Sequence, residues 1–327
     1  MLASIRDISK KTGLSISTIS RYLNSSGYVS KESAELIRKV VADLDYIPNR
    51  NAQAIFNKRS GSIGLVIPSL VNPFFAELAT IVGNLIQDDG FGCVLCFTED
   101  NIEKEESALD LLNGYRVDGI IVARGRNIEK IHKLAIPVVS FETLISDDII
   151  TISADNYQGG QVAFNHLYDR GCRNILHIKG PNRFVATEDR CQGFLDAAKD
   201  HGLQVDILPL STDYLLGENF DAELGQLDFS KYDGIFVFND INCIYVINYL
   251  KKLNFSIPDD IQVIGFDNSY LSSINLPRLT TIEQSPGEIA TTTYNCLKDL
   301  MDGSNQSTRN RLVPVKLIQG ETTRLNS

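Results

Sequence analysis

Short apolar runs alternate with longer amphipathic stretches from residue 62 to residue 302, and this alternation limits the fold of the chain more than any other feature. The runs have the length of strands buried on both faces, and the stretches repeat apolar residues at helical spacing. The expected strands are Ile63–Ile67, Gly92–Phe97, Gly119–Val122, Val138–Phe141, Thr151–Ser153, Ile175–Ile178, Gly234–Phe238, Val263–Phe266 and Thr280–Glu283. The expected helices lie at about 73–88, 103–114, 157–170, 187–201, 241–253 and 286–302. Such a pattern forms parallel sheets covered by helices, and so many strands favour two lobes over one sheet.

The charge of the chain is divided unevenly along its length. The 327 residues carry a net charge of −10, yet residues 1–60 contain ten Lys and Arg against five Asp and Glu. The first sixty residues are therefore basic, and the remainder is strongly acidic. A basic module on an acidic body is typical of a protein that binds nucleic acid through one end, because phosphates attract the first and repel the second.

The basic segment has the pattern of three short helices that close a small core. Each helix is expected to follow a serine that caps its first turn, and these serines are Ser4, Ser15 and Ser30. Ser4 also has capping-box spacing with Asp7, and Gly13 permits the tight turn before the second helix, Ile16 to Leu23. The third helix is expected to extend to about Leu44. The side chains expected to face inward are Ile5, Ile8, Leu14, Ile19, Leu23, Leu36, Ile37, Val40, Val41 and Leu44. Two short helices joined by a glycine turn form a helix-turn-helix.

The second helix is the expected DNA-recognition element, since the N-terminal side chains of that helix enter the major groove. Arg21 can bond both acceptors of a guanine, Ser17 can bond a base edge, and Ile16 suits a thymine methyl group. The residues expected to contact phosphates are Ser15, Thr18 and Ser20.

Residues 8–24, ISKKTGLSISTISRYLN, resemble the headpiece of the lac repressor/galactose repressor family of transcriptional regulators. The resemblance continues at Val29-Ser30 and at residues 44–50, LDYIPNR. It implies that residues 1–47 are a headpiece that binds double-stranded DNA. It also adds to the expected DNA contacts Ser4, Asn24, Tyr46 and Asn49.

Residues 48–60 are the expected hinge. They contain enough good helix formers for about two turns, and so short a helix is marginal alone in water. In the family, paired hinge helices enter the minor groove, where a leucine wedges a base step. The resemblance places Ile55 at the wedge and Ala52 one turn before it, and the β-branched isoleucine leaves the depth of the wedge open. A plain flexible linker is the alternative.

Polar residues follow several of the expected strands, at the edge where α/β sheets bind ligands. Carboxylates, amides and an arginine beside aromatic faces are the usual equipment for binding sugars, because planar groups bond pairs of hydroxyls and ring faces pack on aromatics. Residues 61–327 also resemble the effector core of the same family over their whole length, in such segments as Asn72–Phe75, Asp155–Gly160, Arg190–Phe194 and Ile264–Asp267.

This second resemblance implies a two-lobed α/β core like that of periplasmic binding proteins, with two parallel doubly wound sheets, behind an all-α helix-turn-helix headpiece. The implied effector contacts are Ser69, Phe74, Glu142, Arg190, Tyr214, Asn239, Asp267 and Gln284. A sugar or sugar derivative is the expected effector. Glu142 stands where the family often has aspartate, and Tyr214 where another aromatic often stacks, so the particular sugar stays open.

Three crossings between the lobes are also implied. The N-terminal lobe is expected to hold about 61–157 and 288–317, and the C-terminal lobe about 158–284 and 318–327. Closure of the lobes on the effector would control whether two hinges can order on DNA. The chain ends without the leucine-heptad tail of tetrameric relatives, so a homodimer and a near-palindromic operator are expected. Repression is the default expectation.

Other classes of protein fit the sequence less well. An exported sugar receptor would need a signal peptide in place of the headpiece. An enzyme would need a site, and the four histidines match no triad, zinc motif or nucleotide-binding loop, so neither catalysis, cofactor nor metal is expected. A regulator that responds to a phosphoprotein stays open as an alternative.

The cysteines and the hydropathy pattern indicate a cytoplasmic protein. The six cysteines are scattered without a signal peptide, so reduced thiols are expected. Cys93 and Cys96 form a CxxC inside an apolar run, and we expect both in the buried core, on opposite faces of a strand. No apolar stretch reaches about 18 residues without a charge or turn residue, so no membrane span is expected.

Overall fold

The computed structural model describes residues 3–24, 26–46, 59–143, 146–211, 218–304 and 310–325. The chain divides into two compact units, Met1–Ser62 and Ile63–Ser327. The expected hinge helix and its residues Asn49, Ala52 and Ile55 lie outside the described residues.

The first unit is a bundle of three helices around a small apolar core. Helix α1 spans Ile5–Thr12, α2 spans Ile16–Leu23 and α3 spans Lys31–Asp43. The fully or almost fully buried side chains are Ile8, Ile19, Ile37 and Val40. The chain turns from α1 to α2 through Gly13, whose φ of 73° favours glycine. The predicted helix-turn-helix is therefore confirmed.

The helices begin at the serines that the sequence indicates. The backbone N–H and the Oγ of Ser4 both donate to Asp7 Oδ2, at 2.9 and 2.7 Å. Ser15 Oγ and Ser30 Oγ accept from the backbone N–H groups of Thr18 and Ser33. One inward assignment was wrong: Leu36 is 42% exposed. The adjacent Ile37, which is fully buried, takes the inward position of that helical turn.

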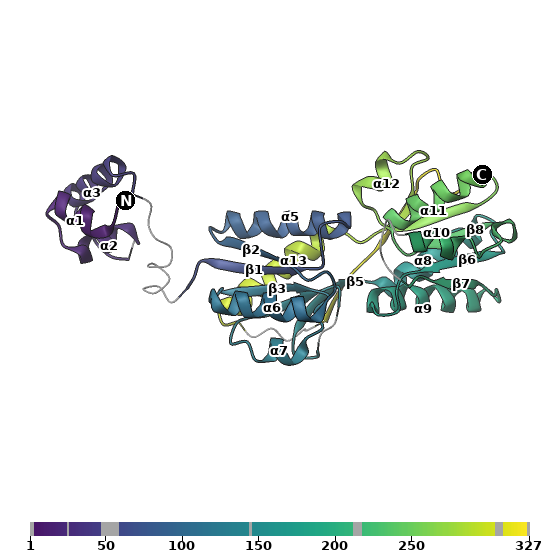
Figure 1. Ribbon diagram of the computed structural model, residues 1–327, viewed down its shortest axis with the longest axis horizontal. Coiled ribbons are helices and arrows are strands. Elements are labelled where there is room, and N and C mark those ends of the chain that lie inside the picture. Colours follow the sequence, from purple (N-terminus) through teal and green to yellow (C-terminus); the bar gives the residue numbers. More distant parts are fainter. Residues whose placement is uncertain are drawn as a thin grey trace. The chain divides into compact units, whose positions relative to one another are not determined.

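The N-terminal lobe of the second unit is a doubly wound sheet in the order β11-β5-β4-β3-β1-β2 (Figure 1). Its strands are β1 Ser62–Ile67, β2 Gly92–Phe97, β3 Gly119–Ala123, β4 Val138–Phe141, β5 Ile150–Ala154 and β11 Asn310–Val313. Helices α5 Pro73–Asp88 and α13 Pro286–Met301 pack on one face, and α6 Ile102–Gly114 and α7 Ile128–His132 on the other.

The C-terminal lobe repeats this plan in the order β12-β10-β9-β8-β6-β7. Its strands are β6 Ile175–Lys179, β7 Asp206–Pro209, β8 Gly234–Val237, β9 Gln262–Asp267, β10 Thr280–Glu283 and β12 Lys316–Ile318. Helices α8 Asn156–Asp169 and α9 Val185–Asp200 cover one face, and α10 Glu218–Leu224 and α11 Asp240–Lys252 the other. A short 3-10 turn, Phe229–Lys231, precedes β8, and α12 spans Tyr270–Ile274.

The strand pairs confirm the predicted fold class with one difference in direction. The neighbouring strands from β11 to β1 in the first sheet and from β10 to β7 in the second pair in parallel, whereas β10 and β12 are antiparallel. The chain passes between the lobes after β5, after β10 and after β11. The last passage comes earlier than the residue 317 inferred from the sequence, because Lys316–Ile318 already pairs with β10.

Backbones meet directly where α8 crosses α9. A Cβ at Gly160 of α8 would clash with the carbonyl oxygen of Arg190, and one at Gly193 of α9 with that of Tyr157. Reciprocal glycines therefore hold α9, and Arg190 on it, against the first turn of α8, next to the first crossing between the lobes.

Two expectations about the surface have different outcomes. Cys96 is buried as predicted, but Cys93 is exposed. Strand β2 lies at the edge of the sheet, where neighbouring elements cover its outward side chains only in part. Among the described helices, none is long and apolar enough to span a membrane.

Candidate functional site

The exposed face of α2 carries the side chains predicted to contact DNA bases. Ile16, Ser17 and Arg21 are exposed, whereas Ile19 is fully buried and fixes the orientation of the helix. Ser15 caps the helix and also bonds Ser17 Oγ and Thr18 Oγ1, both at 2.8 Å. The Arg21 side chain lies against Gly27, where a Cβ would meet its Cδ at 3.1 Å. Helix α2 thus presents hydroxyls and a methyl-bearing side chain at its N-terminal end and one cation, Arg21, in its last turn.

The other predicted DNA contacts differ in how exposed their side chains are. Ser4 is exposed at the N-terminus of α1. Ser20 and Asn24 are partly buried and bond each other, with Asn24 Nδ2 donating to Ser20 Oγ at 3.1 Å. Tyr46 packs against the apolar core of the headpiece, so it supports the fold of this unit.

In the second unit, Arg190 is the centre of the predicted effector site on the C-terminal lobe. It lies on α9 and is 4% exposed. Its Nε donates to Asn156 Oδ1 at 2.8 Å, its Nη1 donates to the Phe238 carbonyl at 2.6 Å, and its guanidinium lies 3.6 Å from the Phe266 ring centroid. Burial lowers the pKa of Arg190, and the nearby carboxylates of Asp267 and Glu142 oppose that shift. The side chain is therefore a rigidly held cation.

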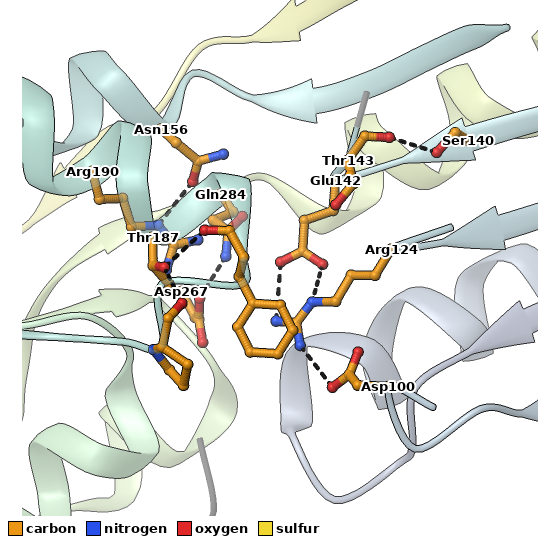
Figure 2. Close-up of polar contacts among 12 residues, drawn as sticks. Asp100, Arg124, Ser140, Glu142, Thr143, Asn156, Thr187, Arg190, Asp267 and Gln284 are labelled. Atoms are coloured by element: carbon orange, nitrogen blue, oxygen red, sulfur yellow. Dashed lines mark hydrogen bonds and ion pairs between the residues drawn. The ribbon is translucent and has the colours of Figure 1, made fainter. Parts of the chain in front are cut away.

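Asp267 faces the same region from the end of β9 (Figure 2). Gln284 Nε2 donates to Asp267 Oδ1 at 2.5 Å, and the backbone of Asp267 has a φ of 119°. Burial raises the pKa of Asp267 to about 7, against the opposing effect of Arg190. Burial also raises the pKa of Asp240, whose carboxylate accepts from Thr281 Oγ1 and from the backbone N–H of Ser269. Strained backbone and perturbed carboxyls are typical of functional sites.

The N-terminal lobe contributes Glu142, which is 8% exposed, at the end of β4. Its two oxygens accept from Arg124 Nε at 2.7 Å and Nη2 at 3.3 Å. Arg124 Nη1 also lies 3.3 Å from Asp100 Oδ2. Figure 2 shows this group of Asp100, Arg124 and Glu142 facing the group of Arg190, Asp267 and Gln284 across the space between the lobes.

The other predicted effector residues with a described position are Ser69, Phe74 and Asn239. Asn239 is buried and caps α11, with its Oδ1 accepting from the backbone and side chain of Asn242. Ser69 is partly buried after β1, and Phe74 is buried in the first turn of α5, edge-on to Phe75 at 5.3 Å. Tyr214 lies outside the described residues. The structure thus groups Glu142, Arg190, Asp267 and Gln284 and places Ser69, Phe74 and Asn239 at the ends of neighbouring elements.

Arg124 and Asp100 are not among the residues predicted from the sequence. Both follow strands of the N-terminal sheet, Asp100 after β2 and Arg124 directly after β3. The rule that ligands bind beyond the carboxyl ends of parallel strands would have found them, had it been applied to every strand. Among the described residues, no group of His, Cys, Asp and Glu is arranged to hold a metal ion.

Comparisons with known proteins agree with this architecture. Residues 4–49 match the model of bacterial regulatory proteins of the lacI family, and residues 164–323 match that of the periplasmic binding protein-like domain. The ribose operon repressor of Halalkalibacterium halodurans is 33% identical over 99% of this chain and 98% of its own length. The chain therefore belongs to the lacI family, a class of DNA-binding transcriptional regulators.

Solved structures show the same likeness. A periplasmic binding protein/LacI transcriptional regulator from Alkaliphilus metalliredigens, complexed with D-xylulofuranose, is 42% identical with a TM-score of 0.75, covering 81% of this chain and 100% of that one. The lac repressor dimer bound to operator and an anti-inducer has a TM-score of 0.86 and covers 99% of each chain at 23% identity, which shows the shared fold.

Proposed function

We propose that this protein is an operon repressor whose affinity for DNA is set by a small sugar, a pentose or a ketose in furanose form, bound between the lobes. The observation that carries the proposal is the group of polar side chains between the lobes: Arg190, Asp267 and Gln284 of one lobe face Glu142 and Arg124 of the other (Figure 2). The sugar in the 42% identical relative supports this choice of effector.

The chemistry of these groups suits adjacent hydroxyls. A carboxylate accepts two hydrogen bonds and a guanidinium donates two from a planar edge, so each can engage a pair of neighbouring hydroxyls. The site residues that we propose are Ser69, Phe74, Glu142, Arg190, Tyr214, Asn239, Asp267 and Gln284. Arg190 and Asp267 have the strongest support, because both are buried and held by neighbouring polar groups.

The DNA-binding role falls to the headpiece. We propose direct base contacts for Ile16, Ser17 and Arg21, which share the exposed face of α2. We keep the boundaries expected from the sequence, with residues 1–47 as the headpiece, 48–60 as the hinge and 61–327 as the effector and dimerisation core. A homodimer would place two headpieces on a near-palindromic operator, and lobe closure would change their spacing.

The protein acts in the cytoplasm, where its DNA is, and performs no catalysis. Two facts support the second point: its relative in Halalkalibacterium halodurans is named as an operon repressor, and the carboxyls of Glu142 and Asp267 are occupied by an arginine and a glutamine partner.

Operator selection and a sugar screen test the proposal together. The purified full-length protein is first used to select its preferred duplex from a random library, which should yield a near-palindromic site. Its melting temperature is then measured with D-xylulose, D-ribose and other free sugars, because a ligand of the folded state raises that temperature by mass action. The active sugar should change operator affinity. A protein that prefers no duplex over random DNA would refute the repressor assignment, and a shift with a purine alone would refute the sugar.

A further inference from the structure

Arg124 is held in a fixed and strained geometry between Phe75 of its own lobe and Phe184 of the other. Its backbone φ is 52°, and those of its partners Asp100 and Glu142 are 53° and 69°, all in the left-handed region that residues with side chains rarely adopt. The side chains of the three residues are 13%, 12% and 6% exposed. Strain at three residues that meet in one ion-pair network points to a functional arrangement, because the surrounding fold must enforce it.

The network fixes the direction of the guanidinium. Glu142 accepts from two of its nitrogens, at 2.7 and 3.3 Å, and Asp100 lies 3.3 Å from a third. A guanidinium paired in this planar, two-pronged way has little freedom to rotate, unlike a lysine ammonium.

Aromatic rings of both lobes lie over the guanidinium of Arg124. Arg124 Cζ lies 4.0 Å from the ring centroid of Phe184, which precedes α9 on the C-terminal lobe, and 4.8 Å from that of Phe75 on its own lobe. Phe184 is 5% exposed, and its carbonyl accepts from Thr187 Oγ1 on the helix that carries Arg190. A cation over an aromatic face is an attractive contact, so this pair favours lobe closure.

The charges around Arg124 also limit the class of effector. Within the network, the two carboxylates of Asp100 and Glu142 pair with the single cation of Arg124, which leaves one negative charge in excess. A phosphate ester would bring a dianion against these carboxyls, where like charges repel strongly at low dielectric. A free sugar would only exchange one set of hydrogen bonds for another.

Building on the proposed function, we propose that Arg124 is a specificity-determining residue: held by Asp100 and Glu142, it closes the cleft against Phe184 over an uncharged sugar, and its carboxylate partners exclude the phosphate ester of that sugar.

The test compares two probes on the full-length protein by isothermal titration calorimetry, D-xylulose and D-xylulose 1-phosphate, whose free C5 hydroxyl lets both close the same furanose ring. The free sugar should bind at least about tenfold more tightly than its ester. Asp100→Asn removes one negative charge beside Arg124 with little change of shape. It should therefore reduce the ratio of the two dissociation constants by about tenfold.

Two further variants test the contact between the lobes. Arg124→Met should weaken D-xylulose binding about tenfold, because the cation over Phe184 is lost. The matched control is Arg183→Met: Arg183 also lies over Phe184, at 4.5 Å, but it precedes α9 on the same lobe, so its loss should leave sugar affinity within about twofold. Should Arg124→Met fail to fold, the ratio of the two dissociation constants in Asp100→Asn alone tests the proposal.

An ester that binds as tightly as the free sugar, or an unchanged ratio in Asp100→Asn, would overturn the proposal. It is also refuted if neither probe binds. Operator selection on the same preparation separates this failure from failure of the repressor assignment, since DNA preference does not depend on Arg124.

Discussion

The contact between α8 and α9 allows a sharp prediction about Gly193. A methyl group there would lie far closer than 3.0 Å to the carbonyl oxygen of Tyr157, a backbone atom that cannot swing away. In Gly193→Ala the two helices must move apart by roughly 1 Å, and a gap of about 0.5–1 Å already forfeits a quarter to a half of each dispersion contact across it. The side chains packed around this junction are fully or almost fully buried: Ala163, Phe164, Phe194 and Ala197.

The expected loss is about 3 kcal/mol of unfolding free energy, at the upper end of the usual cost of overpacking. The gain of up to about 1 kcal/mol from replacing a helical glycine offsets this only partly. The assay is urea unfolding of the full-length protein, followed by circular dichroism. The matched control is Gly83→Ala in α5, where a Cβ meets nothing within 4 Å, and it should be neutral or stabilising. A Gly193→Ala protein within about 1 kcal/mol of the parent would refute the reasoning.

Three further predictions concern function and pH. Arg21→Ala should abolish preference for the selected operator and leave weak, salt-sensitive binding, measured by competition with random duplex; undiminished discrimination would contradict base contact by Arg21. Asp267→Ala should abolish the change of operator affinity with sugar while DNA binding persists, and a normally responsive variant would count against the site. Because burial raises the pKa of Asp267 to about 7, the folded protein holds a proton that the unfolded chain releases above about pH 4, so this group's contribution to stability is lost as pH rises from about 4 to 7. Asp267→Asn should therefore stabilise the protein more at pH 8 than at pH 5.5 in urea unfolding, and an equal effect at both values would show that the carboxyl titrates normally.

The helices and strands that the sequence predicted best are those whose ends are marked by nearby residues. The strands Gly92–Phe97, Val138–Phe141 and Thr280–Glu283 and the helix Pro73–Asp88 have the expected bounds, because an uninterrupted apolar run or a cap such as Asn72 marks their ends. The edge strands β7, β11 and β12 were missed. They are short and only partly buried, and an element that is half solvated has no continuous apolar run to identify it.

The candidate site was predictable in part for a different reason. Arg190 and Asp267 stand in segments that resemble a known family, Glu142 follows an expected strand, and all three lie near the space between the lobes. The role of these residues stays a prediction. Arg124 and Phe184 could not be paired from the sequence, since their contact depends on how two lobes built from separate segments come together.

The passage of the chain between the lobes after β5, β10 and β11 has a consequence for incomplete chains. A polypeptide terminated near residue 285 would lack α13 and β11 from one lobe and β12 from the other. It would also lose Thr322, whose hydroxyl donates to the Val263 carbonyl and accepts from the Thr280 N–H. A nonsense mutation near codon 285 should therefore damage both halves of the core at once, and neither half can be expressed as one uninterrupted piece.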